Sequence, residues 1–272
     1  MWDIAVTEML TDIYTPDVDG RRPPESLYGA KKVWAYLQAE GVPVARCTVE
    51  RLMRQHGWQG VRRGRPPRTT IADPDQPRAV DLVDRHFKAD APNRLLVADF
   101  TYVRIKSGFA YTAFVIDAYA GVIAGWDVAN HPDAAMVVRA LTDAAETRTR
   151  QGHPITSGAI HHSDAGRQYT AVALSSTLAE LNLRGSIGSV GDAYDNALAE
   201  ATNGLYKTEC IQSGSPFHNG LNTRADVEQA TADWVHWYNT RRLMHRLGLR
   251  SPLQAETDHY AGRSLDQPAG LT

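Results

Sequence analysis

Three carboxylates stand in sequence contexts that favour chemistry. Asp99 interrupts an otherwise apolar stretch, LLVADFTYV, where a charge costs several kcal/mol unless it lies at an edge, is paired or binds a metal. Asp164 lies in HHSDAGRQYT, just past a predicted short strand, and Glu200 lies on a predicted helix after a Gly-rich loop. Each acid also has a structural interpretation: a strand-end charge for Asp99, a helix N-cap for Asp164 and a solvated helix face for Glu200.

Taken together, the three acids suit phosphodiester transfer, whose transition state places charge on in-line attacking and leaving oxygens. Two divalent cations about 3.5–4 Å apart can stabilise both oxygens. Hard cations such as Mg²⁺ bind carboxylate oxygen and water rather than thiolate. We therefore predict that Asp99 bridges two ions, and that Asp164 and Glu200 each complete the ligands of one ion.

The elements that must position these acids alternate along the chain. Apolar runs predict five strands, at 93–105, 109–117, 122–128, 158–162 and 183–187. Helical spacing of apolar residues predicts four helices, at 132–148, 171–181, 196–209 and 224–242. Three strands in a meander, followed by alternating helix and strand, predict an α/β fold with a sheet of mixed direction.

The charge of the chain is divided unevenly. The 272 residues carry a net charge of −2, with 43% apolar and 22% charged residues, which excludes collagen, low-complexity disorder and a pure coiled coil. Residues 1–20 hold five acids and no base, residues 21–70 carry a net +8, and residues 71–272 carry a net −5. A near-neutral total therefore conceals a basic segment of the kind that binds nucleic acid.

This basic segment predicts a small DNA-binding module. Apolar residues recur at helical spacing over 28–40 and after Pro43, and Gly41 and Gly57 stand where the two helices end. Two short helices joined by a Gly-containing turn predict a helix-turn-helix, and VRRGRPPRTT predicts an extended basic linker. The alternative is a solvated helix face followed by a linker. The residues expected to contact DNA are Arg46, Arg51, Arg54, Arg62, Arg63 and Arg65.

The remaining composition favours a cytoplasmic protein without a membrane segment. Cys47 and Cys210 are too few for a disulfide framework and lack neighbours at zinc-ligand spacing. The N-terminal sequence does not resemble a signal peptide. The longest apolar stretch, Phe109 to Trp126, is interrupted by Asp117, which suits buried strands better than a membrane span.

The three acids also carry a resemblance to a known family. Asp99 in DFTYV, Asp164 in HSDAGRQYT and Glu200 in DAYDNALAE resemble the DDE signature of integrase-core transposases, and 35 residues separate the last two acids, as in the D-(35)-E pattern. The chain is most similar to the catalytic second-frame (OrfB-type) subunit of the bacterial insertion-sequence group called IS-three. The segments YGAKKVWAYLQ…TVERLMRQHGWQGVRR and YNTRRLMHRLGLRSPLQAE resemble that group's helix-turn-helix and C-terminal end.

The resemblance implies an RNase H-like integrase core that cuts and joins double-stranded DNA at terminal inverted repeats and inserts it into target DNA. It implies two Mg²⁺ (or Mn²⁺) ions per active site, held by Asp99, Asp164 and Glu200. It also implies a homo-oligomer on DNA and, as a further partner, the upstream-frame subunit joined by a frameshift. No side-chain nucleophile is expected, unlike in the tyrosine and serine recombinases.

The resemblance gives roles to other residues as well. Lys207 lies two helical turns past Glu200, where integrase-like enzymes keep a basic residue to contact DNA, and a solvated lysine is the alternative. Asp117 resembles the family's second-strand aspartate, which implies a structural role. Arg241 and Arg242 belong to a C-terminal basic cluster expected on phosphate. The residues expected to orient the acids, touch DNA or cap the catalytic helix are His162, Gln168, Asp195 and Asn196.

These motifs divide the chain into five parts. They are a leader or helix at 1–27, a helix-turn-helix module at 28–62, a basic linker at 63–80, the catalytic core at 81–215 and a C-terminal helical extension at 216–272. Two rival functions stay open. An RNase H-like nuclease or resolvase would share the metals but would not need a DNA-reading module. A catalytically silent DNA-binding protein derived from a transposase would not need the three acids.

Overall fold

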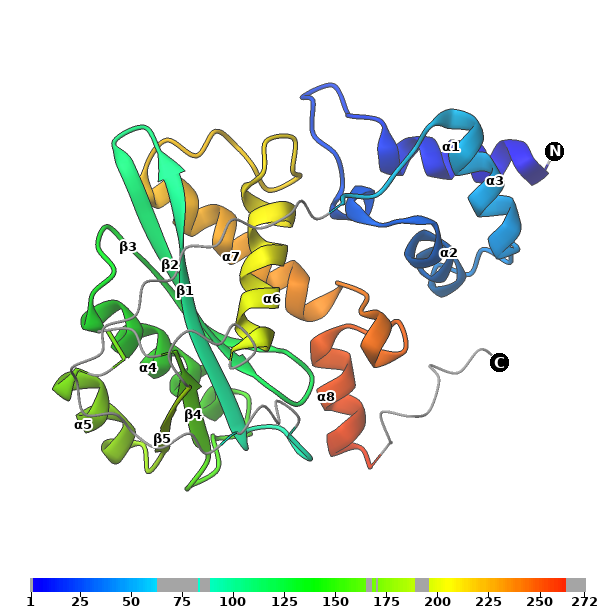
Figure 1. Cartoon of the computed structure of the whole chain (residues 1–272). Helices are drawn as coiled ribbons and strands as arrows, with labels where there is room; N and C mark the ends of the chain where they lie inside the picture. The colour runs from blue at the N-terminus through cyan, green and yellow to red at the C-terminus, as the bar shows by residue number, and fades with distance from the viewer. Residues whose placement is uncertain are drawn as a thin grey trace.

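The computed structural model describes residues 2–62, 83, 89–164, 168–169, 171–188 and 196–262. Within these ranges the chain forms a helical module near the N-terminus and a larger part built on one β-sheet (Figure 1). The basic linker expected at 63–80 lies outside the described residues, which end before it at Arg62. No helix in the described part of the chain is long and apolar enough to cross a membrane.

A mixed five-stranded sheet forms the centre of the larger part, and this confirms the fold predicted from the sequence. Its strands are β1 (Leu95–Ile105), β2 (Gly108–Asp117), β3 (Ile123–Ala129), β4 (Ile160–Ser163) and β5 (Arg184–Ile187). They lie in the order β3-β2-β1-β4-β5. The three long strands form an antiparallel meander because short turns join them, whereas β4 and β5 run parallel to β1. This topology places β1 at the centre of the sheet.

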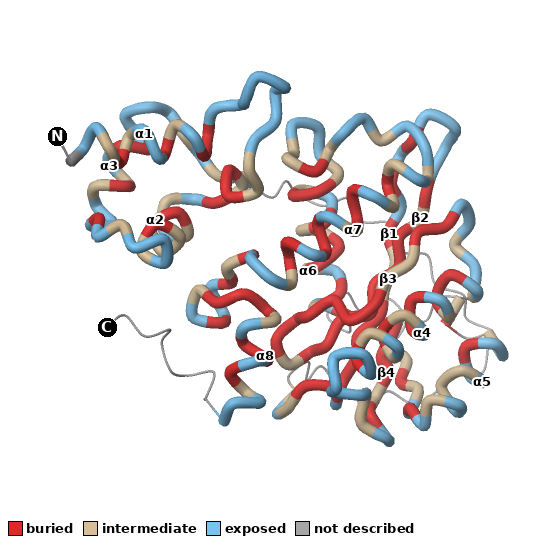
Figure 2. Tube along the Cα trace, turned by 180° about the vertical axis from the view of Figure 1, so that it is seen from behind, coloured by how far each residue is buried: buried red, intermediate tan, exposed pale blue. Residues whose placement is uncertain are grey.

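Helices cover both faces of the sheet, because successive side chains of β1 point to opposite sides (Figures 1 and 2). On one face, Leu96 packs in the same core as Leu141 of α4 (Ala134–Arg150). α5 (Val172–Glu180) adds to this layer. On the other face, Val97 belongs to the core formed with α6 (Ala197–Tyr206) and α7 (Arg224–Thr240).

One glycine allows the helix layer to approach the sheet closely. A Cβ atom at Gly125 of β3 would overlap the backbone of Ala140 and Ala144 in α4, so only glycine fits there. The backbone N–H of Trp126 also donates to Oδ2 of Asp143 at 3.1 Å. Strand β3 and helix α4 are therefore in direct backbone contact.

The N-terminal module contains α1 (Trp2–Tyr14), the short 3₁₀ helix η1 (Pro24–Leu27), α2 (Ala30–Ala39) and α3 (Arg46–His56). Gly57 ends α3 with a φ of 70°, a conformation that favours glycine. The Tyr28 hydroxyl donates to the Arg241 carbonyl at 3.0 Å and accepts from the Leu243 N–H at 3.2 Å. This one side chain thus joins the module to the segment that follows α7.

A buried ion cluster fastens the last helix, α8 (Pro252–Tyr260), to the sheet. The Arg148 guanidinium lies 2.6 Å from Glu256 and 3.2 Å from Asp117, and all three side chains are buried. Burial and the charge of Glu256 raise the pKa of Asp117 to about 6, although Arg148 acts in the opposite direction. Asp117 also accepts hydrogen bonds from the backbone of Asn93 and Tyr119, which agrees with the structural role expected of it.

Candidate active site

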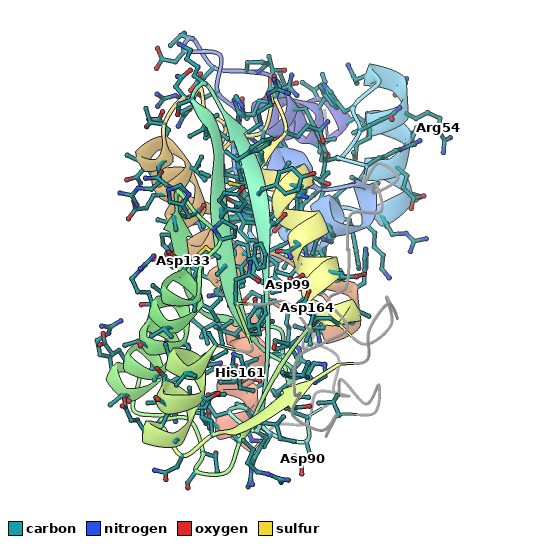
Figure 3. The ribbon with its side chains drawn as sticks, turned by 60° about the vertical axis from the view of Figure 1, so that its left-hand side comes forward. Arg54, Asp90, Asp99, Asp133, His161 and Asp164 are labelled. Carbon is teal, nitrogen blue, oxygen red and sulfur yellow. The ribbon has the colours of Figure 1, made fainter. Side chains whose placement is uncertain are left out.

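The pairing of two parallel strands brings Asp99 and Asp164 together. In the register of β1 and β4, Ala98 lies opposite Ser163, which is the last residue of β4. Asp99 and Asp164 each follow the members of that pair, so both acids stand where the β1–β4 ladder ends. Both are half-buried, and Figure 3 shows them close together beside α6. Residues 65 positions apart in the chain thus become neighbours.

Helix α6 brings Glu200 to the same place. Glu200 lies in the first turn of α6, and Asn203 follows one turn later on the same helix face. Nδ2 of Asn203 donates to Oδ2 of Asp99 at 2.8 Å. Because this bond turns the face that carries Glu200 toward β1, the three acids share one region of the molecule.

Asp99 lies within the electrostatic influence of the other two acids. Burial raises the pKa of Asp99 to about 8, and the negative charges of Asp164 and Glu200 act in the same direction. Hydrogen bonds from the Phe100 N–H and from Asn203 act in the opposite direction without cancelling the rise. The negative charges of Asp164 and Glu200 thus disfavour a charged Asp99, and a bound cation would offset that repulsion.

The donor set suits a hard divalent cation. All three side chains offer carboxylate oxygens, which Mg²⁺ and Mn²⁺ prefer. The raised pKa of Asp99 shows that its environment disfavours an uncompensated negative charge. Within the described ranges, however, no three His, Cys, Asp or Glu side chains are close enough to hold one metal ion. Glu200 is exposed, whereas Asp99 and Asp164 are half-buried.

Lys207 lies at the junction between α6 and a π-helical turn, η2 (Lys207–Ile211), where the sequence predicts a regular helix to 209. Its ammonium group stands 4.6 Å from the centre of the Tyr102 ring. Burial lowers the pKa of Lys207, whereas the charge of Asp99 tends to raise it. Lys207 is therefore an exposed cation within electrostatic reach of Asp99.

The structure places three of the supporting residues that the sequence singles out. His162 is buried in β4 and shares a 2.9 Å hydrogen bond with Ser186, so its position suits orientation of neighbours rather than contact with DNA. Gln168 donates to the Pro132 carbonyl at 2.8 Å. Asn196 occupies the N-cap position of α6, but its side chain accepts no hydrogen bond from the helix, and its Nδ2 donates to the Ala98 carbonyl at 3.2 Å. Of the two residues expected to cap the helix, Asn196 thus forms no side-chain cap, and Asp195 lies outside the described residues.

The arginines expected on DNA fall into three groups. Arg46, Arg51, Arg54 and Arg62 are exposed on or just after α3. Two of these pair with acids: Arg46 with Glu50 at 3.0 Å, and Arg51 with Asp3 at 2.7 Å. Arg63 and Arg65 lie outside the described residues.

The two C-terminal arginines, Arg241 and Arg242, differ in their exposure to solvent. Arg241 is exposed, as expected of a phosphate contact. Arg242 is only 6% exposed and forms two hydrogen bonds with Glu209, at 2.6 and 2.7 Å. The structure therefore corrects the expectation that Arg242 contacts DNA. Its guanidinium forms a buried ion pair with Glu209, and this pair joins η2 to the end of α7.

Asn203 and Tyr169 lie beside the acids although the sequence patterns do not single them out. Burial raises the pKa of the Tyr169 hydroxyl well above its usual value, and the charges of Asp99 and Asp164 add to the rise. Asn203 could have been found from its position three residues after Glu200, on the same helix face. Tyr169 belongs to the HSDAGRQYT motif itself.

Three protein-family models match parts of the chain. A model described as an HTH-like domain matches residues 20–66, which include α2 and α3. Two models described as an integrase core domain match residues 89–193 and 181–252. The integrase-core matches together contain all three acids.

Similar proteins of known name cover most of the chain. A putative transposase for insertion sequence element IS986/IS6110 of Mycobacterium tuberculosis H37Rv is 52% identical over 237 residues, 87% of this chain and 84% of the relative. The transposase for insertion sequence element IS629 of Shigella sonnei is 47% identical over 243 residues, 89% of this chain and 78% of the relative. Among solved structures, a chain of the simian T-cell lymphotropic virus intasome in complex with the PP2A regulatory subunit B56 gamma has a TM-score of 0.51 at 15% identity. The match covers 86% of this chain and 74% of the intasome chain, and the two chains share a fold.

Proposed function

This chain belongs to the integrase-core transposases of the IS-three group of insertion sequences, and on that premise we propose how it acts on DNA. The proposed reaction cleaves strands at the terminal inverted repeats of the element and joins the freed ends to target DNA. Asp99, Asp164 and Glu200 are the proposed catalytic residues. The observation that carries the proposal is the meeting of these acids at the end of the β1–β4 ladder.

In the proposed cleavage step, a water oxygen attacks the phosphorus of the scissile phosphodiester, and the bond from phosphorus to the 3′ oxygen breaks. In the joining step, the freed DNA 3′-hydroxyl attacks a phosphorus of target DNA, the bond from that phosphorus to the target's own 3′ oxygen breaks, and the target strand leaves with a 3′-hydroxyl. Divalent cations, two per site and held by Asp99, Asp164 and Glu200, would supply Lewis-acid stabilisation of the attacking and leaving oxygens. No side chain is covalently attached to DNA at either step.

The chain's own residues orient the acids and the DNA. Asn203 and the Phe100 N–H each donate to one oxygen of Asp99 at 2.8 Å, which fixes the plane of that carboxylate. Lys207 is the proposed contact to a phosphate near the scissile bond, since its cationic head is exposed and adjacent to Asp99. These contacts position the reacting groups without taking part in bond exchange.

In this proposal each part of the chain has its own role. The helix-turn-helix module at 28–62 reads the inverted repeat through the exposed arginines of α3, and the linker at 63–80 leads to the core at 81–215. The extension at 216–272 supports the core, and its Arg241 contacts phosphate. Because two element ends must be held together, the protein acts as a homo-oligomer on DNA, with the upstream-frame subunit as a further partner.

The test is Mg²⁺-dependent cleavage of a duplex that carries the inverted repeat found beside the gene. Asp99→Asn should abolish cleavage and leave DNA affinity nearly unchanged, because the substitution keeps the shape of the side chain and removes its charge. Gln229→Ala, which alters an exposed side chain of α7, is the matched control. Equal cleavage by Asp99→Asn and the unaltered protein would refute the proposal.

The same assay separates the rival functions. Cleavage without any joining of 3′ ends to a target duplex would identify a nuclease or resolvase. DNA binding without metal-dependent product, with either Mg²⁺ or Mn²⁺, would identify a silent DNA-binding protein.

A further inference from the structure

An exposed strip of aromatic and cationic side chains extends from the candidate active site toward the β1–β2 turn. We call it the β1 strip and define it by Tyr102, Arg104, Lys106, Phe109 and Lys207. Tyr102 is 40% exposed and Phe109 is 46% exposed, which is unusual for large apolar side chains in this chain. The proposed roles of the three acids do not account for it.

The two aromatic rings form an ordered pair at the surface. Their centres lie 5.4 Å apart and their planes meet at 87°, the edge-to-face arrangement that aromatic pairs prefer. In the register of the hairpin, Arg104 lies opposite Phe109, and Tyr102 lies two residues away from Arg104 on the same face. The pair therefore presents π surface to solvent next to an arginine.

The cations of the strip are not neutralised. Arg104, Lys106 and Lys207 are exposed, and no carboxylate within the described ranges forms an ion pair with any of them. The strip therefore combines aromatic surface with exposed cations that form no ion pair in this part of the chain.

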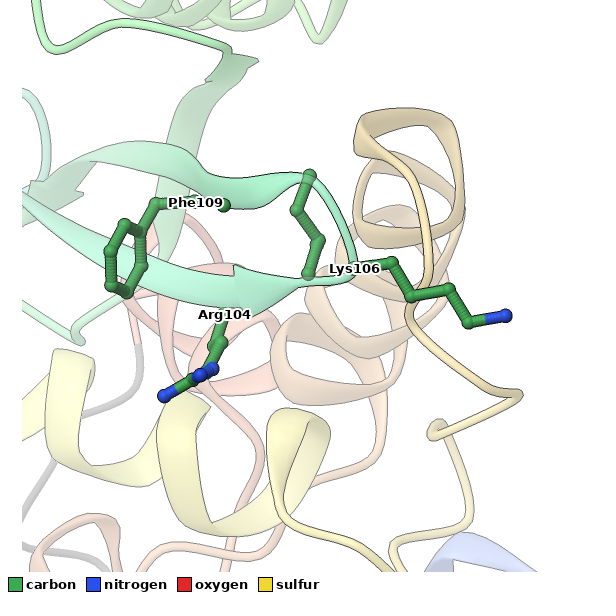
Figure 4. Close-up of a pocket in the computed structure, with 5 residues that line it drawn as sticks. Arg104, Lys106 and Phe109 are labelled. Carbon is green, nitrogen blue, oxygen red and sulfur yellow. The ribbon is translucent and has the colours of Figure 1, made fainter.

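The hollow at the hairpin end is open to a ligand of moderate size. It has a volume of about 400 Å³ and is lined by Arg104, Ile105, Lys106, Gly108 and Phe109. Figure 4 shows the side chains of Arg104 and Phe109 beside the hairpin, with Lys106 extending from its turn. A groove of basic and aromatic side chains is the arrangement with which proteins hold unpaired nucleic acid.

The strip reaches the candidate active site through Lys207. Its ammonium group stands 4.6 Å from the centre of the Tyr102 ring and lies within the electrostatic influence of Asp99. Tyr102 follows Asp99 by three residues of extended strand, about 10 Å or about three steps of B-DNA, and this odd spacing turns the two side chains to opposite faces of the sheet. Among the described strands, β4 pairs with β1 only from Leu95 to Ala98, so this stretch of β1 has β2 alone as a partner.

We propose that Tyr102 and Phe109 stack on an unpaired base of the DNA strand whose phosphates contact Arg104, Lys106 and Lys207. The strip would thereby hold the end of a frayed strand beside the three acids. The inference rests on the proposed function, because it takes DNA as the substrate. It goes further by naming the state of the DNA, a locally unpaired strand, and the side chains that recognise it.

The probe is a duplex carrying the inverted repeat, with 2-aminopurine placed in turn at each position near the cleavage site. Stacking on an aromatic ring quenches the fluorescence of this base. Phe109→Leu keeps an apolar side chain but removes the π face, whereas Phe109→Trp keeps the π face. Tyr260→Leu is the matched control, because Tyr260 is 42% exposed and lies on α8. Quenching is measured in an Asp99→Asn background and cleavage in the unaltered background.

We expect quenching at one position in the parent protein, loss of it in Phe109→Leu and retention in Phe109→Trp and Tyr260→Leu. We expect Phe109→Leu to cleave paired DNA roughly tenfold more slowly, in line with the loss of one stacked base. A mismatch that opens the quenched position should restore most of this rate. A merely structural role for the pair would change the melting temperature but would not depend on a mismatch.

Three results would overturn the inference. The first is that Phe109→Leu and Tyr102→Leu both quench the fluorescence and cleave the DNA as the parent protein does. The second is an equal loss in Tyr260→Leu. The third is a changed oligomeric state of Phe109→Leu by light scattering with unchanged quenching, which would make the pair a protein interface. Failure of the proposed function is distinguishable, because then the parent protein itself gives no metal-dependent cleavage.

Discussion

Asn203 donates a hydrogen bond of 2.8 Å from Nδ2 to Oδ2 of Asp99, and this bond joins helix α6 to the central strand β1. The other oxygen of Asp99 accepts from the Phe100 N–H at 2.8 Å. Both oxygens of this carboxylate are thus oriented by the protein itself. A metal ligand that is oriented before binding loses less freedom when the ion arrives.

Replacing Asn203 with alanine should therefore weaken metal use without removing a ligand. We expect the Mg²⁺ concentration for half-maximal cleavage to rise roughly 10–100-fold, as is usual when a group that orients a ligand is lost. A metal titration of the cleavage assay measures this shift, with Gln229→Ala as the control. An unchanged titration curve for Asn203→Ala would contradict the orienting role.

Arg148 and Arg150 lie in the same helix but should differ strongly in their effect on stability. Arg148→Met leaves Asp117 and Glu256 buried without their cation, so we expect the free energy of unfolding to fall by about 3–5 kcal/mol. The Arg150–Glu146 pair is more than 60% exposed on both sides at 3.7 Å, so Arg150→Met should cost less than about 1 kcal/mol. Urea unfolding measures both, and similar losses would contradict the burial argument.

The adjacent residues Arg241 and Arg242 should separate DNA binding from stability. Arg241→Met should weaken DNA binding and lower the salt dependence by about one phosphate contact, with little effect on unfolding. Arg242→Met should leave Glu209 buried and unpaired and cost about 3–5 kcal/mol. Fluorescence anisotropy at several salt concentrations and urea unfolding provide the two readouts. If Arg242→Met instead weakened DNA binding and left the free energy of unfolding unchanged, Arg242 would be a DNA contact after all.

The pKa of Asp117, raised to about 6 from an ordinary value of 3.8, predicts a pH dependence of stability. Between about pH 4 and 6 the folded state binds this proton more tightly than the unfolded chain, so the contribution of Asp117 to stability falls as pH rises. Asp117→Asn lacks this titration, while Arg148 and Glu256 still face the position.

The stability advantage of the unaltered protein over Asp117→Asn should therefore narrow by about 1–3 kcal/mol as pH rises from 4 to 7. Urea unfolding of both proteins at pH 4, 5, 6 and 7 gives the comparison. Groups that titrate equally in both proteins cancel in the difference. A gap that widens with pH would show that Arg148 dominates the titration of this carboxyl.

The sequence predicted the sheet well because strand alternation is a local property. The runs expected at 93–105 and 109–117 are β1 and β2, displaced by no more than two residues at their ends. The helix expected to 209 ends at Tyr206, because the last turn widens into η2. No apolar spacing distinguishes a π turn from an α turn over so few residues.

The site was less predictable than the fold. The adjacency of Asp99 and Asp164 arises from strand pairing over a long stretch of chain, which no local pattern encodes; it was expected only from the chemistry of a shared metal site and from the family resemblance. Arg242 shows the opposite case: a basic cluster indicates a DNA contact, yet Glu209, 33 residues away, buries the guanidinium. Asn196 likewise has the residue type of a helix cap, but the Ala98 carbonyl binds its side chain.

The end of the β1–β4 ladder at Ala98 also determines how the site can move. Amide hydrogens within a paired ladder exchange slowly with solvent, since exchange requires the strands to separate. Asp99 lies just past the β1–β4 ladder but stays paired with Phe114 of β2, whereas Glu200 lies in the first turn of a helix, where fraying begins. Of these two carboxylates, we therefore expect Asp99 to keep its position and Glu200 to adjust as a substrate enters.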